Sequence, residues 1–315
     1  MTICRDTRAA SGPMTTDPAN ARLSYLLLSL TTLFWSGNVL LGRYFHDLLP
    51  PLALNFWRWV AAAAILAPFA LRPLIEQRTI VLRHWKLLAI LGALGVTGFN
   101  SMSYTALHST TAINVALINS LMPIMVVVLS WLGFRETIGA RQGIGIALSL
   151  AGALTIVAHG EIGALLALRF APGDVMMIVA VLLYSAYSVL LRLKPPALGG
   201  IALLGAIVGF GLVLSLPLLA IETVTVGPLP LTVESLGVVV YVGLFPSVLA
   251  YVFWNKGVAT IGANRASLFI HLLPTFTAIL AILFLGESLH LYHLAGIALI
   301  FGGLVLATRP RRANL

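Results

Sequence analysis

The chain has 315 residues, of which 59% are hydrophobic and only 9% are charged. Because a soluble globular domain carries about 25% charged residues, this composition excludes a water-soluble fold and indicates a chain embedded in lipid. The net charge of +9 admits two explanations, a nucleic-acid-binding surface or basic residues that flank membrane spans, and the positions of these residues decide between them.

The chain begins with a polar segment. Residues 1–22 are rich in small and polar types, and we expect them to form a disordered cytoplasmic leader. The single cysteine, Cys4, lies in this leader, and one thiol cannot make an internal disulfide or a metal cluster. We therefore expect no cofactor and no metal site. The apolar segment from Leu23 lacks a clear small-residue cleavage site, so we interpret it as a membrane span and not as a removed signal peptide.

Apolar segments long enough to cross a bilayer follow one another along the rest of the chain. A span needs about 20 mainly apolar residues, and the sequence contains ten such segments joined by short connections. They predict an all-α integral membrane protein with ten transmembrane helices and no separate soluble domain. The predicted spans cover residues 24–43, 51–71, 86–107, 111–133, 142–158, 173–193, 199–221, 235–256, 262–285 and 291–308.

The basic residues are distributed unevenly between the two ends of these spans. If both termini lie on one side of the membrane, 16 of the 19 Lys and Arg residues fall on that side. Only Arg43 and Arg169 fall on the other side, and Arg58 lies within a span. The positive-inside rule then places both termini in the cytoplasm. We expect a multi-pass protein of the bacterial inner membrane whose partner is the lipid bilayer, with no nucleic-acid partner.

The two halves of the chain resemble each other. A shift of 151 residues aligns the last three spans of each half, and a shift of 149 residues aligns the first two. No single match would persuade, because Gly and Pro are common in apolar helices, but together they indicate a repeat. The aligned residues are Pro123 with Pro274, Glu136 with Glu287, Gly145–Leu148 with Gly296–Leu299, Ala112 with Ala263, Gly152 with Gly303, Trp35-Ser36 with Tyr184-Ser185, Arg43 with Arg192 and Pro68 with Pro217.

This repeat predicts the domain organisation. Each copy contains five spans, and because five is odd, the second copy enters the membrane upside down relative to the first. Inverted repeats of this kind are typical of secondary transporters, whose sites lie near the bilayer midplane between the halves. We expect a first five-helix repeat at 23–158, a linker at 159–171, a second five-helix repeat at 172–308 and a basic cytoplasmic tail at 309–315.

Short motifs stand in the second, fourth, ninth and tenth spans: Phe56-Trp57-Arg58, Leu121-Met122-Pro123 with Glu136, Leu272-Leu273-Pro274 with Leu285-Gly286-Glu287, Gly296 and Gly302-Gly303. Through these motifs the chain after residue 22 resembles the EamA-type branch of the drug/metabolite transporter superfamily. The resemblance implies ten helices in two inverted repeats around a central cavity. It also implies transport of amino acids, other metabolites or drugs, and some members resemble aromatic amino-acid exporters, of which this chain could be one.

A first candidate site lies in the ninth span. Asn264, Ser267 and His271 are spaced i, i+3 and i+7 and therefore share one helix face. His271 lies about 14 Å into its span, near the midplane, where polar groups are costly and commonly functional. It aligns with Ser120, which follows Asn119 in the fourth span. The alternative is that His271 only ties its helix to a neighbour.

Two aligned prolines strengthen this candidate. Pro123 and Pro274 each lie three residues beyond Ser120 and His271. Proline removes a backbone hydrogen bond and can kink a helix, and interrupted helices in matching positions of two halves mark transporter sites. We therefore predict helix breaks at both prolines.

The second candidate is Arg58, which lies well inside the second span. A buried guanidinium needs an acceptor, and it could hold a substrate carboxylate with two parallel hydrogen bonds. It could equally pair with helix-end carbonyl groups or with lipid phosphate. The sequence leaves both explanations open.

Polar and aromatic stripes on other spans complete the candidate substrate-binding residues. Their members are spaced by three or four residues, so each stripe lies on one helix face. Asn100 aligns with Tyr251 and Tyr104 with Asn255. Some of these aromatic residues could instead belong to the interfacial belts. The candidates are Trp35, Asn38, Asn100, Tyr104, Tyr184, Tyr187, Tyr251, Trp254 and Asn255.

The charges inside the spans bear on the substrate. No Asp or Glu lies deep in a predicted span, whereas Arg58 and His271 do. A small solute that bears a carboxylate or is zwitterionic therefore fits better than a cation. Proton coupling would require His271 or a carboxylate at a span end, and transport without coupling is equally open.

We expect a small-metabolite transporter, an exporter of solutes such as amino acids, that works by alternating access. Efflux of drugs on the same fold is the alternative. An intramembrane enzyme is less favoured, because it needs a nucleophile with a base or a metal cluster. His271 has Ser267 four residues before it, but the sequence contains no Gly-x-Ser-Gly stretch and no His-rich ligand set. The glycine-rich fifth and tenth spans are expected to pack closely as scaffold, or to form the surface of a homodimer.

Overall fold

A computed structural model describes residues 18–45, 49–161, 163, 171–285 and 288–308. Within these ranges, ten helical segments are long and apolar enough to cross a membrane. Their bounds fall within a few residues of the predicted spans, so the prediction of ten transmembrane helices is confirmed.

The first half of the fold contains five spans built from several helices. The third span consists of α4, the π-helical segment η1 and α5, and the fourth consists of α6 and α7. The elements are α1 (Pro18–Tyr44), α2 (Pro51–Glu76), α3 (Arg78–Arg83), α4 (Trp85–Gly92), η1 (Ala93–Gly98), α5 (Phe99–Ala106), α6 (Ala112–Asn119), α7 (Met122–Phe134) and α8 (Ala140–Val157).

The second half contains the other five spans. The eighth span consists of α12, the π-helical η3 and α13, and the ninth consists of α14, the 3₁₀-helical η4 and α15. The elements are α10 (Pro172–Leu190), η2 (Leu191–Leu193), α11 (Gly200–Thr225), α12 (Val233–Val242), η3 (Gly243–Leu249), α13 (Ala250–Ile261), α14 (Ala263–Ala266), η4 (Ser267–His271), α15 (Leu272–Leu285) and α16 (Leu291–Thr308).

The N-terminal end of α1 differs from the expected leader. The helix begins at Pro18, so residues 18–22, which we expected to be disordered, are helical. Proline is favoured in the first turn of a helix, where its missing N–H needs no partner. The hydroxyl of Ser24 also donates to the carbonyl of Asn20 at 2.9 Å within this turn. Cys4 and the rest of the leader lie outside the described residues, as does the tail at 309–315.

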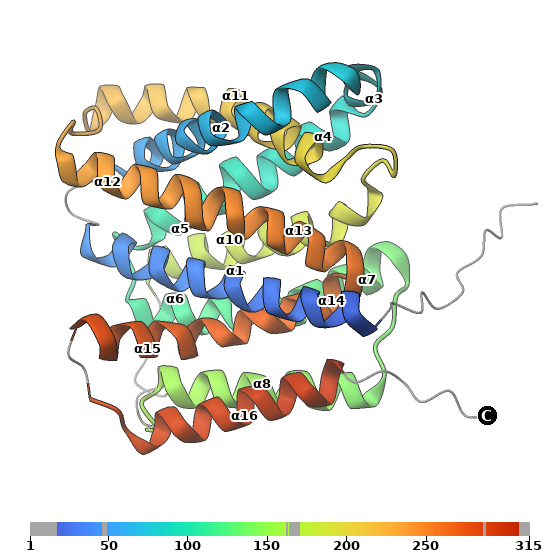
Figure 1. The fold of residues 1–315 in the computed structure, drawn as a ribbon. Coiled ribbons are helices and arrows are strands. Elements are labelled where there is room, and N and C mark those ends of the chain that lie inside the picture. Colours follow the sequence, from blue (N-terminus) through green and yellow to red (C-terminus); the bar gives the residue numbers. More distant parts are fainter. Residues whose placement is uncertain (1–17, 46–48, 162, 164–170, 286–287, 309–315) are drawn as a thin grey trace, which may run out of the picture.

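Both described ends of the chain lie on one side of the bundle. In Figure 1, α1 begins and α16 ends at the right, whereas α12 and α16 begin at the left. We call the first side the terminal end and the second side the far end. Because each half has five spans, the second half runs through the bundle in the opposite direction to the first, as the inverted repeat predicts.

The helix irregularities also follow the repeat. The π-helical η1 lies in the third span and η3 in the eighth, and a shift of 151 residues moves 93–98 onto 244–249. The break between α6 and α7 at Ser120 aligns likewise with His271, the last residue of η4. π-Helical turns are frequent at functional sites because they release backbone groups from the regular ladder. The irregular segments therefore indicate where the two halves build a site.

Helices α8 and α16 pack together beside the rest of the bundle, at the bottom of Figure 1. Their glycines permit a very close approach. A Cβ atom on Gly145 would lie 2.6 Å from the carbonyl oxygen of Gly303, and one on Gly152 would lie 2.6 Å from that of Gly296. The expected close packing of these two spans is therefore present.

Candidate functional site

Arg58 lies in α2 with only 1% of its surface exposed. Its Nε donates to Ser247 Oγ in η3 at 2.9 Å. One of its Nη atoms donates to Asn100 Oδ1 at 3.1 Å and to the hydroxyl of Tyr104 at 2.6 Å. All three acceptors are neutral, and they come from both halves of the chain.

Arg58 has no carboxylate partner among the described residues. Among the described residues, Arg–carboxylate pairs join Arg72 to Glu76 and Arg192 to Glu136, at 2.8 Å each. The side chains of both pairs are exposed to a large extent, whereas the guanidinium of Arg58 is buried. A buried charge without a counter-charge is costly, because desolvation is not offset by an ion pair.

The buried carboxylates of the described chain serve other purposes. Glu222 accepts from the backbone N–H groups of Leu52 at 3.0 Å and Ala53 at 2.5 Å, and so caps the first turn of α2. Asp174 accepts from Asn114 Nδ2 at 3.0 and 2.9 Å and from the hydroxyl of Thr110. Neither carboxylate is therefore available to Arg58.

A hydrogen-bond network holds the groups around Arg58. The hydroxyl of Tyr104 donates to Asn38 Oδ1 at 2.7 Å. Asn100 Nδ2 donates to the carbonyl of Gly95 in η1 at 2.9 Å and to the hydroxyl of Tyr251 at 3.3 Å. These bonds fix the amide oxygen of Asn100 toward Arg58, so the guanidinium is held in place from three spans.

A small cavity lies beside Arg58. Its volume is about 60 Å³, which is room for roughly two water molecules. On its wall the buried hydroxyl of Ser103 has no hydrogen-bond partner among the described residues, and the polar side chain of Asn119 also borders the cavity. The wall consists of Trp35, Asn38, Val39, Arg58, Phe99, Asn100, Ser103, Tyr104, Leu107, Val115, Asn119, Met122, Met177, Ile270 and Leu273.

A wider pocket of about 540 Å³ adjoins this cavity. Val39, Val115, Asn119 and Leu273 line both. The wider pocket also reaches the first residues of α6 and α16, which begin at the far end. The cavity beside Arg58 thus shares four wall residues with a pocket that extends to the far end of the bundle.

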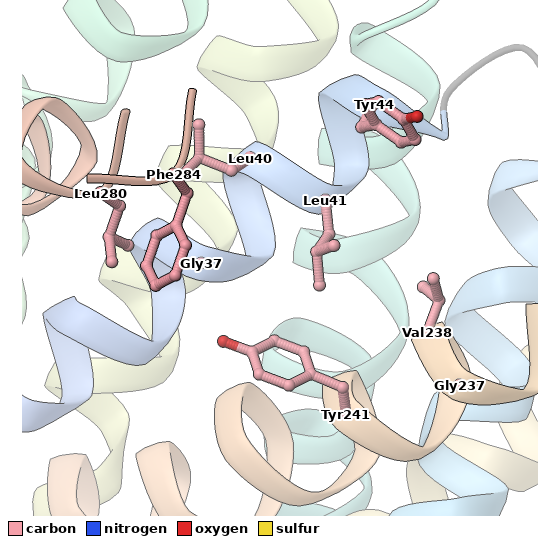
Figure 2. A pocket seen from close by; sticks show the side chains of 9 residues that line it. All are labelled: Gly37, Leu40, Leu41, Tyr44, Gly237, Val238, Tyr241, Leu280 and Phe284. Carbon is pink, nitrogen blue, oxygen red and sulfur yellow. The ribbon is translucent and has the colours of Figure 1, made fainter. Parts of the chain in front are cut away.

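A third hollow, of about 820 Å³, lies between α1, α12 and α15. Figure 2 shows its lining, which is apolar apart from the hydroxyls of Tyr44 and Tyr241. The Tyr241 hydroxyl lies directly against Gly37, where it would meet any added Cβ atom. Leu40 also lines the 540 Å³ pocket and separates the two. None of the predicted site residues lines this hollow. Its wall is Gly37, Leu40, Leu41, Tyr44, Gly237, Val238, Tyr241, Leu280 and Phe284.

Buried aromatic rings separate Arg58 from the terminal end. Tyr184 and Tyr187 lie in the later part of α10, and Trp254 lies in α13, which leads toward that end. The Tyr184 ring lies 5.4 Å from Trp35 and 5.6 Å from Trp254, measured between ring centroids. The hydroxyl of Tyr187 donates to Asn255 Oδ1 at 2.7 Å. These candidates form a packed layer, and only one member of the layer, Trp35, lines the cavity. The layer consists of Trp35, Tyr184, Tyr187, Trp254 and Asn255.

His271 is fully buried, and it lines none of these three hollows. Its Nδ1 lies 2.6 Å from Ser149 Oγ in α8, and its Nε2 lies 2.9 Å from the carbonyl oxygen of Ser120. The ring thus joins the ninth span to the fifth span and to the break in the fourth. These contacts favour the interpretation of His271 as a tie between helices.

The other residues of the His271 face also lie away from the three hollows. Ser267 donates to the carbonyl of Asn264 at 3.2 Å. The side chain of Asn264 is buried with neither polar atom bonded. The prolines occupy the predicted breaks: Pro123 is in the first turn of α7 and Pro274 in the first turn of α15. Pro274 also lines the 540 Å³ pocket.

Among the polar residues around Arg58, the sequence analysis missed Ser103 and Ser247. Ser103 was detectable, because it follows Asn100 by three residues and precedes Tyr104, so it shares their helix face. Ser247, the acceptor for Arg58 Nε, aligns with an apolar residue, Val96, under the repeat. Neither spacing nor symmetry could have identified it.

The ten spans, the two inverted halves and the cavity between them define a multi-pass membrane transport protein. Residues 22–158 and 171–309 each match the EamA-like transporter family. The chain belongs to this family, and the family domain is present twice.

Several relatives are similar over most of the chain. An uncharacterized transporter, YyaM, of Bacillus subtilis is 24% identical over 286 residues, which cover 90% of this chain and 93% of the relative. A probable terminal-alkyne amino-acid exporter of Streptantibioticus cattleyicolor is 24% identical, with 90% and 92% covered. Protein PecM of Dickeya dadantii is 29% identical, with 70% and 73% covered.

A solved structure has the same fold. It superposes with a TM-score of 0.71 at 19% sequence identity and covers 92% of this chain and 96% of its own. At this identity the similarity extends to the fold alone.

Proposed function

We propose that this transporter exports small carboxylate-bearing metabolites, amino acids among them, across the bacterial inner membrane by alternating access between its two inverted halves. The observation that carries the proposal is Arg58. Its guanidinium is 1% exposed, bonds only to neutral groups and borders a cavity between the halves.

A solute carboxylate would supply the anion that Arg58 lacks. Two parallel N–H···O bonds from a guanidinium are among the strongest contacts a carboxylate can make, since both partners are charged. The second Nη of Arg58 makes no hydrogen bond to a described residue, and the unbonded hydroxyl of Ser103 and the amide of Asn119 lie on the same wall. The wall therefore offers several donors to one small anion.

The walls also bear on the rest of the solute. No Asp or Glu is among the described residues that line the cavity or the 540 Å³ pocket, so a lipophilic cation would find no counter-charge there. An ammonium group would need neutral acceptors. Pro123 cannot donate to the carbonyl group four residues earlier, that of Asn119, and Asn119 lines the cavity.

The size of the cavity supports a mechanism in which the two halves of the protein move relative to each other. A volume of about 60 Å³ holds water but no amino acid, so the halves must separate before a solute binds. Inverted repeats supply two such arrangements of similar energy, one open to each side. Breaking and remaking the contacts at the boundary between the halves would carry the solute across.

Two observations support the direction and the orientation. The relative from Streptantibioticus cattleyicolor is called a probable amino-acid exporter. Basic residues gather at the terminal end, which the positive-inside rule assigns to the cytoplasm. The 540 Å³ pocket would then face the periplasm.

Transport by purified protein in liposomes tests the proposal. Amino acids, other small carboxylates and lipophilic cations should be offered with and without a proton gradient. We expect uptake of one or more carboxylates that is lost in Arg58→Gln and kept in Arg72→Gln, a matched change at an exposed arginine. Rapid movement of a lipophilic cation with no movement of any carboxylate would instead support drug efflux.

A further inference from the structure

The terminal end of the bundle contains a packed counterpart of the 540 Å³ pocket. The repeat shift of 151 residues moves three residues that line this pocket onto residues near the terminal end. Ala281 moves onto Ser130 in α7, Ala116 onto Ser267 in η4, and His293 onto Gln142 in α8. Ser130 is 1% exposed and Ser267 is fully buried, so this counterpart is closed.

These three counterpart positions carry polar side chains, and two of them, Ser130 and Ser267, align with alanines of the open pocket. A polar group is costly in a packed interior when it has no hydrogen-bond partner, because nothing offsets its lost contact with water. Yet Ser130 Oγ and Gln142 Nε2 are buried without any hydrogen bond, and so are both polar atoms of Asn264 nearby in α14. Packing in the closed arrangement does not account for these residues.

We propose that Ser130, Gln142, Ser267 and Asn264 line the terminal half of the solute pathway, which opens when the two halves exchange conformations. The inference rests on the alternating access of the proposed function and extends it to named residues. In the open arrangement water and solute satisfy the polar atoms that are unbonded here. The same exchange closes the 540 Å³ pocket at the far end.

A specific contact holds the terminal half shut. The hydroxyl of Tyr25 in α1 donates to the carbonyl of Thr308 at the end of α16, at 3.2 Å. The Tyr25 ring stacks on Phe269 in η4 at 5.7 Å between centroids. Thr308 aligns with Val157, which lines the open pocket, so this contact lies where the opening must form.

Cysteine accessibility tests the assignment without knowledge of the solute. Single cysteines replace serines on two different spans, Ser130→Cys and Ser267→Cys, in a Cys4→Ser background. The matched control is Ser215→Cys in α11, because Ser215 is 3% exposed and aligns with Leu66, which does not line the pocket. A membrane-impermeant maleimide is applied from the side of the C-terminus, and folding is checked by size-exclusion chromatography.

We expect both pathway cysteines to react while Ser215→Cys stays unlabelled. Tyr25→Phe removes one hydrogen bond and keeps the ring, so it should raise the labelling rate of both about fivefold, as a net bond of about 1 kcal/mol implies. Reaction no faster than that of Ser215→Cys, with and without Tyr25→Phe, would overturn the assignment.

The labelling result is separable from the proposed function. If the cysteines are labelled as expected in protein that moves no carboxylate, the pathway assignment is supported and the proposed substrate class is wrong. If the protein transports a carboxylate but its pathway cysteines never react, the substrate class is supported and the pathway assignment is wrong. Ala281→Cys, labelled from the far end through the open pocket, confirms that the reagent reaches a pathway cysteine.

Discussion

Asn100 and Tyr251 occupy equivalent positions in the two halves, and they touch: Asn100 Nδ2 donates to the Tyr251 hydroxyl at 3.3 Å across 151 residues of sequence. The pseudo-two-fold axis of the inverted repeat therefore passes beside this pair. The opposite side of the same amide, Asn100 Oδ1, accepts from Arg58 at 3.1 Å. The deeply buried guanidinium of Arg58 thus lies next to the axis.

The first prediction concerns Tyr104, which joins Arg58 to Asn38. Tyr104→Phe removes both hydrogen bonds of the hydroxyl, at 2.6 and 2.7 Å. A bond to a charged group contributes about 1.5–3 kcal/mol, so we expect solute affinity to fall by about tenfold or more while the protein still folds. Solute titrations by calorimetry measure the change.

The control for Tyr104→Phe is a change at the equivalent hydrogen bond of the other half. Tyr187 bonds Asn255 at 2.7 Å, and the two residues align with Asn38 and Tyr104, with the residue types exchanged. Because Tyr187 does not touch Arg58, Tyr187→Phe should leave the affinity within about threefold, the effect of a neutral bond of about 0.5 kcal/mol. Equal losses in the two variants would contradict a special role for the Arg58 network.

The second prediction concerns His271. Because its ring bridges Ser149 and the Ser120 carbonyl, His271→Ala should destabilise the protein by about 1–3 kcal/mol for each buried group left unbonded. Ser149→Ala should lower the melting temperature less, because the second bridge survives. Solute affinity should not change in either variant. A large loss of affinity in His271→Ala, with an unchanged melting temperature, would restore the substrate role that the sequence suggested.

The third prediction concerns the glycine contact of α8 and α16. Gly152→Val places a Cβ atom 2.6 Å from the Gly296 carbonyl oxygen, with two further methyl groups beyond it, and must push the helices apart. Overpacking of this kind costs about 1–3 kcal/mol or more, so we expect a lower melting temperature and less folded protein. Gly133→Val is the control, since a Cβ there meets nothing within 4 Å. Equal stability of the two variants would contradict the close packing.

The fold followed from the sequence more fully than the site did. Each span is set by a long apolar segment, and twin features such as Pro123 and Pro274 are set by the repeat, so both were predictable. Whether a buried polar residue faces a cavity or another helix depends on the rotation of each span. That rotation placed Arg58 beside the cavity and His271 against Ser149, and the sequence contains no signal that separates these outcomes.

The fourth prediction concerns orientation. Reporter fusions after Gly227, which follows α11 at the far end, and after Arg312 should report opposite sides of the membrane, with the C-terminal fusion cytoplasmic. The reason is the excess of basic residues at the terminal end. Reports from the same side for both fusions would contradict the three spans that follow Gly227.

The most direct test of the account asks whether Arg58 holds the carboxylate of the solute. For a carboxylate that the protein moves, the affinity of the acid and of its uncharged primary amide is measured with the wild type and with Arg58→Gln. A charged pair of this kind is worth about 1.5–3 kcal/mol, so the wild type should prefer the acid by about tenfold or more, and Arg58→Gln should bind acid and amide about equally. If Arg58→Gln keeps the full preference for the acid, another group binds the carboxylate and the central claim is wrong.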